Sequence, residues 1–170
     1  MDNARRTALR SLGVGALALA LTACGFTPVY GPGSAARQIA PALRLADPTE
    51  RLGYLFVAAV EERLPPSGAP LYDVSYSFGY SAEGLDTIGV SRVQIEGSVT
   101  VSFVERATGR VVLTDEVKGF VSVTNSGVLS QSRTEEANER LMQILADKFV
   151  TLVMLRAPEL LPQPASEPPR

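Results

Sequence analysis

Apolar and polar residues alternate over three long stretches in the middle of the chain, 72–81, 92–103 and 111–124. A period of two predicts β-strands, and a single apolar face predicts an antiparallel sheet that is covered on one side only. The other face is expected to be rich in Ser, Thr and charged residues, which occupy the intervening positions. The apolar positions of the first stretch are Tyr72, Val74, Tyr76, Phe78 and Tyr80.

Short connections are expected between these strands. A polar link around Glu83-Gly84 separates the first two stretches. The sequence Arg106-Ala107-Thr108-Gly109 is typical of a hairpin turn, in which Gly109 is free to take a positive φ. Ahead of the three stretches, the short apolar run 39–45 predicts an edge strand, because Pro41 disfavours a central position in a sheet.

A helix is predicted before the long strands. Its start is Asp47-Pro48-Thr49-Glu50, with Asp47 as the cap, Pro48 in the first helical position and Glu50 as the acid of a capping box. Apolar residues then recur at helical spacing as far as Leu64, and Pro65-Pro66 is expected to end the helix.

A second helix is predicted after the strands. Ser132-x-x-Glu135 forms another capping box, and apolar residues follow at helical spacing up to Arg156. Pro158 is expected to terminate this helix. The remaining residues, 158–170, are Pro-rich and predict a disordered tail.

The predicted order of elements is β-α-β-β-β-α. The two apolar helix faces and the single apolar sheet face must be buried, and they can be buried against each other, which favours an α+β fold. We expect a two-layer sandwich in which two helices pack on one face of a largely antiparallel four-stranded sheet. Residues 37–157 would form this single domain.

The amino-terminal residues 1–23 are typical of a bacterial export signal. Arg5, Arg6 and Arg10 give a positive start, and an apolar run follows that is shorter than the roughly 20 residues needed to span a bilayer. The run ends at Leu21-Thr22-Ala23-Cys24, which resembles the lipobox of bacterial lipoproteins. That resemblance implies cleavage before Cys24, a diacylglycerol on its thiol and an acylated amino group. Two or three acyl chains would anchor the chain firmly at a membrane, with 24–36 as a tether.

The composition of the chain excludes several kinds of catalytic and metal-binding site. The chain has 170 residues, a formal net charge of −2, no His and one Cys. A zinc site, a nucleophile activated by His and an intramolecular disulfide are thereby excluded in their usual forms. The charge balance does not suggest a nucleic-acid binder, which is typically basic. We therefore expect a protein that is not an enzyme and has no cofactor apart from the covalent lipid on Cys24.

The chain as a whole resembles the lipopolysaccharide-assembly lipoproteins (LptE-like, alphaproteobacterial type). The resemblance rests on the lipobox, on the start Cys24-Gly25-Phe26-Thr27-Pro28-Val29-Tyr30-Gly31, on the order of elements and on the closing helix that contains Glu135-Glu136-Ala137. It covers about residues 1–156. In lipoproteins, an Asp directly after the lipidated Cys favours retention in the inner membrane. This chain has Gly25 at that position, so the resemblance implies an outer-membrane lipoprotein. Its implied partner is a large β-barrel that delivers lipopolysaccharide to the cell surface, with this chain as plug and assembly scaffold on the periplasmic side or inside the lumen.

Four residues are candidate site residues. Cys24 is the lipidation site. Arg106 and Arg110 flank the hairpin turn, and Arg133 opens the second helix, which we expect near the same end of the sandwich. Arg binds phosphate with a bidentate fork, so these three are candidate contacts for lipopolysaccharide or for the partner. Solvated surface charges are the alternative for Arg106 and Arg110. For Arg133, a cation at a helix N-terminus is in an electrostatically poor position, which suggests an external anion.

Two further patterns have structural explanations. The stripe Tyr72, Tyr76 and Tyr80 is expected in the core instead of forming a ligand platform. The pairs Glu61-Glu62 and Glu135-Glu136 are expected to be solvent-facing charges or cap partners, not acid–base pairs.

Two alternative functions remain open. The first is a periplasmic auxiliary lipoprotein of a lipid-transport ATP-binding-cassette system, which also carries a small α+β domain on a lipidated Cys. The second is a hydrolase, which the lack of His and of a Gly-x-Ser-x-Gly motif disfavours.

Overall fold

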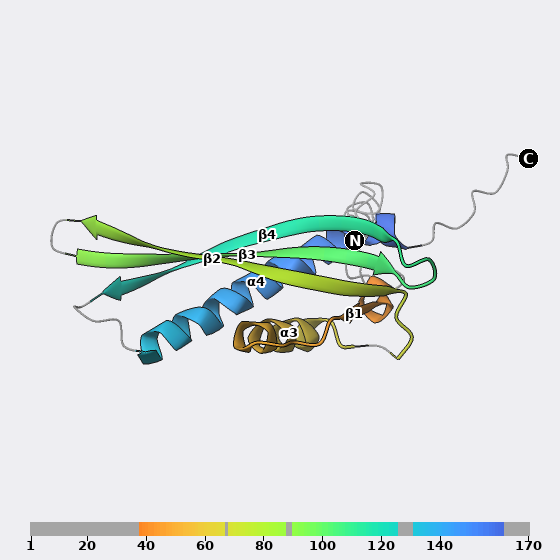
Figure 1. Ribbon diagram of the computed structural model, residues 1–170, viewed down its shortest axis with the longest axis horizontal. Helices are drawn as coiled ribbons and strands as arrows, with labels where there is room; N and C mark the ends of the chain where they lie inside the picture. The colour runs from red at the N-terminus through yellow and green to blue at the C-terminus, as the bar shows by residue number, and fades with distance from the viewer. Residues whose placement is uncertain (1–37, 67, 88–89, 126–130, 162–170) are drawn as a thin grey trace, which may run out of the picture. The chain divides into compact units, whose positions relative to one another are not determined.

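The computed structural model describes residues 38–66, 68–87, 90–125 and 131–161. Within these ranges, α3 and α4 cover one face of a four-stranded sheet, as the sequence predicts (Figure 1). The elements follow one another as η1 (Ala40–Ala42), β1 (Leu43–Leu45), α3 (Arg51–Arg63), β2 (Tyr72–Thr87), β3 (Val90–Glu105), β4 (Val111–Asn125) and α4 (Gln131–Leu160). The predicted two-layer α+β sandwich is confirmed.

The sheet is largely antiparallel, with the strand order β1-β2-β3-β4. The long strands pair antiparallel, whereas β1 pairs parallel with β2 over Leu43–Leu45. The predicted link at Glu83-Gly84 is wrong, because β2 continues through it and Gly84 lies opposite Val93. The side chains become more polar there, but the backbone pairing with β3 continues, so a loss of apolar side chains does not mark the end of this strand.

The core lies between the helices and the sheet. Phe56 of α3, Phe103 of β3 and Phe149 of α4 are fully buried. Their ring centroids lie 5.8 Å apart for Phe56 and Phe149 and 6.3 Å apart for Phe103 and Phe149. Aromatic pairs at these separations add to the stability that burial of apolar area provides.

Helix α3 begins three residues later than the predicted cap implies. Its N-cap is Glu50, which makes no side-chain capping bond. The reason lies in the sheet: the backbone N–H of Ala46 still donates to Val74 of β2 at 2.9 Å, so residues 47–50 are needed to reach from the sheet to the helix. Pro48 then packs against Gly53 in the first turn, where a Cβ would lie 3.2 Å from the Pro48 side chain. The helix ends before Pro65-Pro66, as predicted.

Helix α4 continues past Pro158, so the prediction that this proline terminates it is wrong. Ala157 and Leu160 are buried in the core, and the Tyr72 hydroxyl donates a hydrogen bond to the Leu160 carbonyl. These contacts stabilise the last turn, while proline removes only its own donor. The predicted cap Ser132 also lies inside the helix, which begins at Gln131. The predicted signal 1–23, the tether 24–36 and residues 162–170 of the predicted tail lie outside the described residues.

Glycines let α4 approach the sheet closely. A Cβ on Gly97 would lie 2.9 Å from Leu141 Cδ2, and one on Gly119 would lie 3.0 Å from Ile144 Cγ2. Gly97 and Gly119 are opposite each other on β3 and β4, so they form one flat seat for the helix.

Candidate functional site

The sheet has a second face that α3 and α4 do not cover. It consists of the odd-numbered residues 73–81 of β2 and the even-numbered residues 94–102 of β3 and 114–124 of β4, which we call the outer face. Its side chains are mostly Ser, Thr and charged residues. The face is therefore a flat, hydroxyl-rich surface on three long strands, as the alternation predicts.

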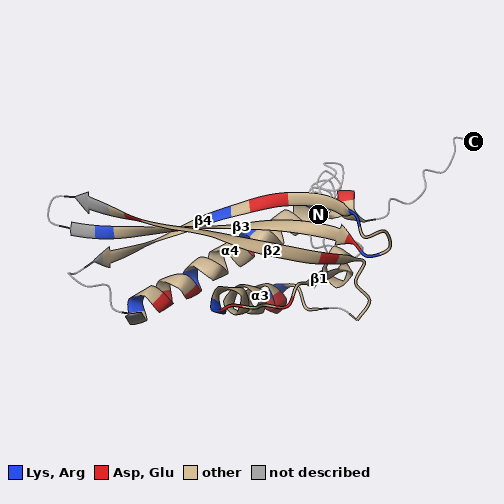
Figure 2. Ribbon diagram, in the orientation of Figure 1, with Lys and Arg blue, Asp and Glu red and all other residues tan. Residues whose placement is uncertain are grey.

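Polar side chains on this face bond to one another. The hydroxyls of Ser102 and Thr114 lie 3.1 Å apart across β3 and β4, and Gln94 Nε2 donates to Glu96 Oε1 at 2.8 Å. Lys118 Nζ lies 2.9 Å from Glu116 Oε2. The hydrogen bond from Lys118 lowers the pKa of Glu116, and the same bond raises the pKa of Lys118. Figure 2 shows the acidic and basic segments next to each other on β4.

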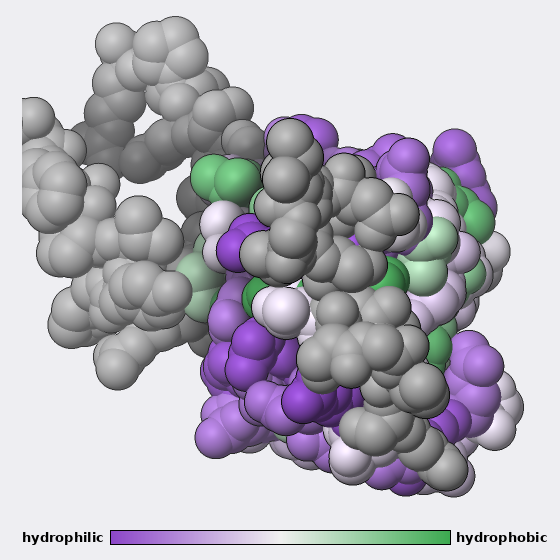
Figure 3. All heavy atoms as spheres, turned by 90° about the vertical axis from the view of Figure 1, so that its left-hand side faces the viewer, coloured by the Kyte–Doolittle hydropathy of each residue, from purple (hydrophilic) through white to green (hydrophobic). Residues whose placement is uncertain are grey.

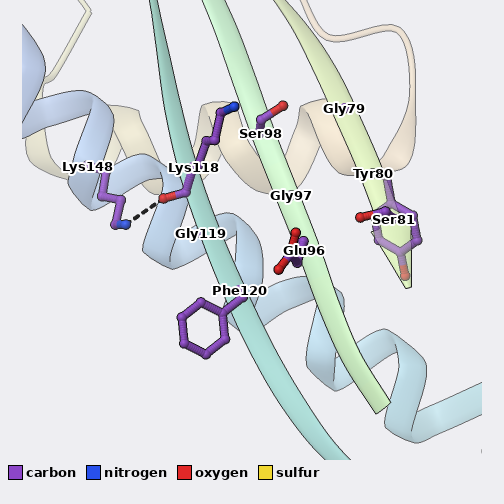
Figure 4. Close-up of a pocket in the computed structure, with 10 residues that line it drawn as sticks. All are labelled: Gly79, Tyr80, Ser81, Glu96, Gly97, Ser98, Lys118, Gly119, Phe120 and Lys148. Atoms are coloured by element: carbon purple, nitrogen blue, oxygen red, sulfur yellow. Dashed lines mark hydrogen bonds between the residues drawn. The ribbon is translucent and has the colours of Figure 1, made fainter. Parts of the chain in front are cut away.

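A shallow hollow of about 490 Å³ lies at the middle of the long strands. Tyr80, Ser98 and Phe120 are among the residues that line it, and Phe120 is 60% exposed although it is a large apolar residue (Figure 4). From the helix layer, Lys148 Nζ donates to the backbone carbonyl of Lys118. The arrangement brings two aromatic rings, hydroxyls and charged groups together.

The hairpin arginines lie at one end of the sheet. Arg106 is exposed, and its Nε lies 3.4 Å from Asp73 Oδ2. Arg110 is exposed too, and its backbone N–H donates to the Thr108 hydroxyl at 3.3 Å. The turn is as predicted, with Gly109 at φ 70°.

Arg133 lies at the opposite end, so the prediction that it shares an end with the hairpin is wrong. Its guanidinium donates to the Thr124 carbonyl at 3.4 Å, next to the end of β4. β4 has 15 residues, and a strand rises about 3.3 Å per residue, so it carries the chain away from the hairpin before α4 begins (Figure 1).

A second hollow, of about 440 Å³, surrounds Arg133 together with Glu136 and Arg140. Arg140 is already paired with Glu136 at 3.2 Å. Figure 3 looks at this end of the sheet, where the described residues in view are mostly hydrophilic.

The tyrosine stripe enters the core only in part. Tyr72 is buried and Tyr76 half-buried, but Tyr80 is 49% exposed, so its expected core position is wrong. The Tyr76 hydroxyl is buried against Gly53 and has no hydrogen-bond partner among the described residues. Burial, and then the charges of Asp47 and Glu50, raise its pKa.

The glutamate pairs behave as surface charges. Glu61, Glu62 and Glu136 are exposed, and Glu135 lies 3.9 Å from Arg51 of α3. Cys24, the predicted lipidation site, lies outside the described residues. Sequence reasoning missed Phe120, although its apolar ring on the polar register of 111–124 breaks the alternation and is visible in the sequence.

Neither a membrane-spanning helix nor a metal-binding cluster is found among the described residues. None of the helices in these ranges has both the length and the apolar character that a membrane crossing requires. The same residues contain no cluster of three or more His, Cys, Asp or Glu side chains placed to hold a metal ion.

Comparisons with known proteins identify the fold. No protein-family model and no curated protein matches the chain in sequence. The solved structure of a candidate lipoprotein from Caulobacter crescentus CB15 aligns with a TM-score of 0.60 at 16% identity, covering 76% of this chain and 99% of that one. A minor lipoprotein from Acinetobacter baumannii aligns with a TM-score of 0.50 at 13% identity, covering 67% of this chain and 89% of that one. The chain therefore has a fold that is also found in bacterial lipoproteins.

Proposed function

We propose that this protein is an outer-membrane lipoprotein that acts, without catalysis, as plug and assembly scaffold of a large β-barrel that delivers lipopolysaccharide to the cell surface. The lipid is attached to Cys24. The domain lies on the periplasmic side of the membrane or within the barrel lumen.

The outer face is the observation that carries this proposal. Barrels of this class have a polar interior, and a domain seated there must present polar groups without burying unpaired charge. The outer face offers hydroxyls on three adjacent strands, and among its charged residues Glu116 and Lys118 are paired with each other and Asp73 is paired with Arg106. Such a surface exchanges hydrogen bonds with water for hydrogen bonds with a polar wall at little net cost.

The anchor and the fold support the same conclusion. The sequence Leu21-Thr22-Ala23-Cys24 supplies a lipobox, and the domain that follows has a fold found in lipoproteins. Arg106 and Arg110 project from the hairpin end of the sheet, where their guanidinium groups bind phosphates of lipopolysaccharide or acidic loops of the barrel. Arg133 would make a separate contact, since it lies at the other end.

The test is extraction of the tagged full-length chain in mild detergent from its native membrane, with a photocrosslinking residue in place of Thr100 at the centre of the outer face. We expect a much larger β-barrel protein to co-purify and to be crosslinked. The control is Cys24→Ala, which should lack acyl chains by mass spectrometry and should recover less of the barrel.

Two outcomes would contradict the proposal. Extraction as a lone monomer without a crosslinked partner would rule out the scaffold role. Crosslinking to subunits of an inner-membrane transporter would instead favour the auxiliary lipoprotein of a lipid-transport ATP-binding-cassette system.

A further inference from the structure

Strand β4 forms a long open edge of the sheet. It is the last strand in the order, has 15 residues and contains no proline. Within the described residues no further strand pairs with it. Such an edge presents unpaired backbone donors and acceptors, which makes it a template for another strand.

Two backbone bonds show which groups face outward. Glu105 N donates to the Arg110 carbonyl toward β4, and Arg106 N donates to the Leu71 carbonyl toward β2. Odd-numbered residues of β3 therefore bond toward β4, where their partners also have odd numbers, such as Val99 and Val117. It follows that the even-numbered residues of β4 direct their N–H and C=O groups away from the sheet.

Two outward-facing backbone groups beside Val117 are already bonded within the chain, because Glu116 N–H donates to Asp115 Oδ1 at 2.9 Å and the carbonyl of Lys118 accepts from Lys148. The carbonyl of Lys118 is an outward-facing group, and Lys148 of α4 donates to it. An incoming strand must displace both contacts. Its N–H replaces the ammonium group of the exposed Lys148, which returns to water, and its carbonyl replaces Asp115 as the acceptor of Glu116 N–H.

The side chains at the edge are self-complementary. Glu116 and Lys118 lie on the outer face on either side of Val117. An antiparallel copy of β4 centred on Val117 places Lys118 of the second copy opposite Glu116, and the reverse pair forms by symmetry. We propose that two copies of this chain associate through their β4 edges, about a two-fold axis at Val117, to form one continuous sheet.

The helix side of the same register is complementary too. Asp115 of the second copy is placed opposite Gly119, next to Lys148, which reaches this edge from α4. The Asp115 side chain is 27% exposed, and its Oδ2 is held by Arg156; Oδ1 becomes available to Lys148 of the other copy once the incoming strand takes over Glu116 N–H. On the outer face, Phe120 is placed opposite Thr114, an aromatic pair with a β-branched residue.

Neighbouring registers are less favourable. If the two-fold axis lay at Glu116 instead of Val117, the Glu116 side chains of the two copies would lie opposite each other. If it lay at Lys118, the two Lys118 side chains would do so. Like charges directly opposite each other destabilise a strand pair. The charges therefore select the register centred on Val117. This inference goes beyond the proposed function and does not depend on it.

The experiment measures the oligomeric state of the processed full-length chain in detergent by native mass spectrometry across a concentration series. We expect a dimer. Each of the variants Glu116→Lys and Lys118→Glu should raise the dimer dissociation constant about tenfold or more, because both symmetric pairs become repulsive. The double variant carrying both changes should restore the dimer, since it exchanges the charges without altering the complementarity.

The matched control is Glu83→Lys, which makes the same charge change on β2 and should leave the dissociation constant unchanged. Amide exchange at residues 116, 118 and 120 should slow as the dimer forms. A monomer at every concentration would overturn the proposal. So would a dimer that is insensitive to the single reversals or is not restored by the double variant, and so would a different protein occupying this edge.

Discussion

At the scale of single residues, two glycines decide how closely the layers pack. Gly97 and Gly119 are paired on adjacent strands, and the leucine and isoleucine side chains of α4 occupy the space that a Cβ would need. Their role here is close approach, not an unusual backbone conformation, since Gly109 has the only positive φ in the described residues.

Gly97→Val should lower the free energy of unfolding by about 2–3 kcal/mol, because the new side chain overpacks against Leu141 and Leu145. The measurement is denaturant unfolding followed by circular dichroism. Gly84→Val is the matched control on β2, where nothing lies within 4 Å of the added Cβ, and it should be neutral or slightly stabilising. Equal destabilisation by both variants would show that space at Gly97 is not limiting.

The sequence predicted some residue roles and missed others. Gly109 was identified from the turn chemistry, because the signal is local. The roles of Gly97 and Gly119 were not, because a glycine in an alternating strand shows no preference for either face and the crowding comes from a helix far away in the chain.

At the scale of elements, α4 is the longest helix in the described residues and crosses the sheet diagonally. Near its start Arg133 contacts the end of β4, and at its end the Leu160 carbonyl accepts from Tyr72 of β2. Burial of Ala157 and Leu160 stabilises the turn after Pro158.

Tyr72→Phe should cost about 1 kcal/mol of unfolding free energy, because the buried Leu160 carbonyl loses its donor while the ring packing is kept. Amide exchange in the last turn of α4 should also become faster. Tyr80→Phe is the control, since Tyr80 is half-exposed on the same strand. If both variants unfold alike, the Tyr72 hydroxyl contributes nothing to the end of the helix.

Periodicity predicted all the long elements, but three of their predicted ends were wrong. The three strands and two helices were identified because burial on one face imposes a period of two or 3.6. The predicted ends at Glu83-Gly84, Asp47 and Pro158 were wrong. Pairing with β3, the bond from Ala46 to β2 and the packing of Leu160 are contacts between distant residues, and they outweigh local signals.

At the scale of the whole domain, one ion pair joins the two layers at their edge. Asp115 of β4 accepts from Arg156 of α4 at 3.1 Å and from the backbone N–H of Glu116 at 2.9 Å. The backbone bond from Glu116 and then the bond from Arg156 lower the pKa of Asp115.

Because the pKa of Asp115 is lower in the folded state than in the unfolded chain, this contribution to stability is present above the ordinary aspartate pKa and is lost as the pH falls through the folded value. Asp115→Asn should therefore reduce the loss of unfolding free energy between about pH 7 and about pH 3. Urea titrations at both pH values provide the measurement, with Glu83→Gln as a control for charge. An unchanged pH dependence would exclude Asp115 as a contributor.

The sequence could not place distant sites relative to one another. Arg133 was expected beside the hairpin, yet it lies at the other end of β4, so the full length of this strand separates it from the hairpin. The polar outer face, in contrast, was predictable, because alternation alone determines which side chains share a face.

The short strand β1 determines how the domain would respond to mechanical pulling. The described fold begins at Gln38 and continues through η1 and β1, and β1 pairs with β2 over three residues only. Tension applied to the amino terminus would reach this junction before any other pairing in the sheet. Ile39, Ala42 and Leu43 are buried there, so their hydrophobic contacts would bear most of the load, and rupture would begin at β1 while the three long strands stayed joined.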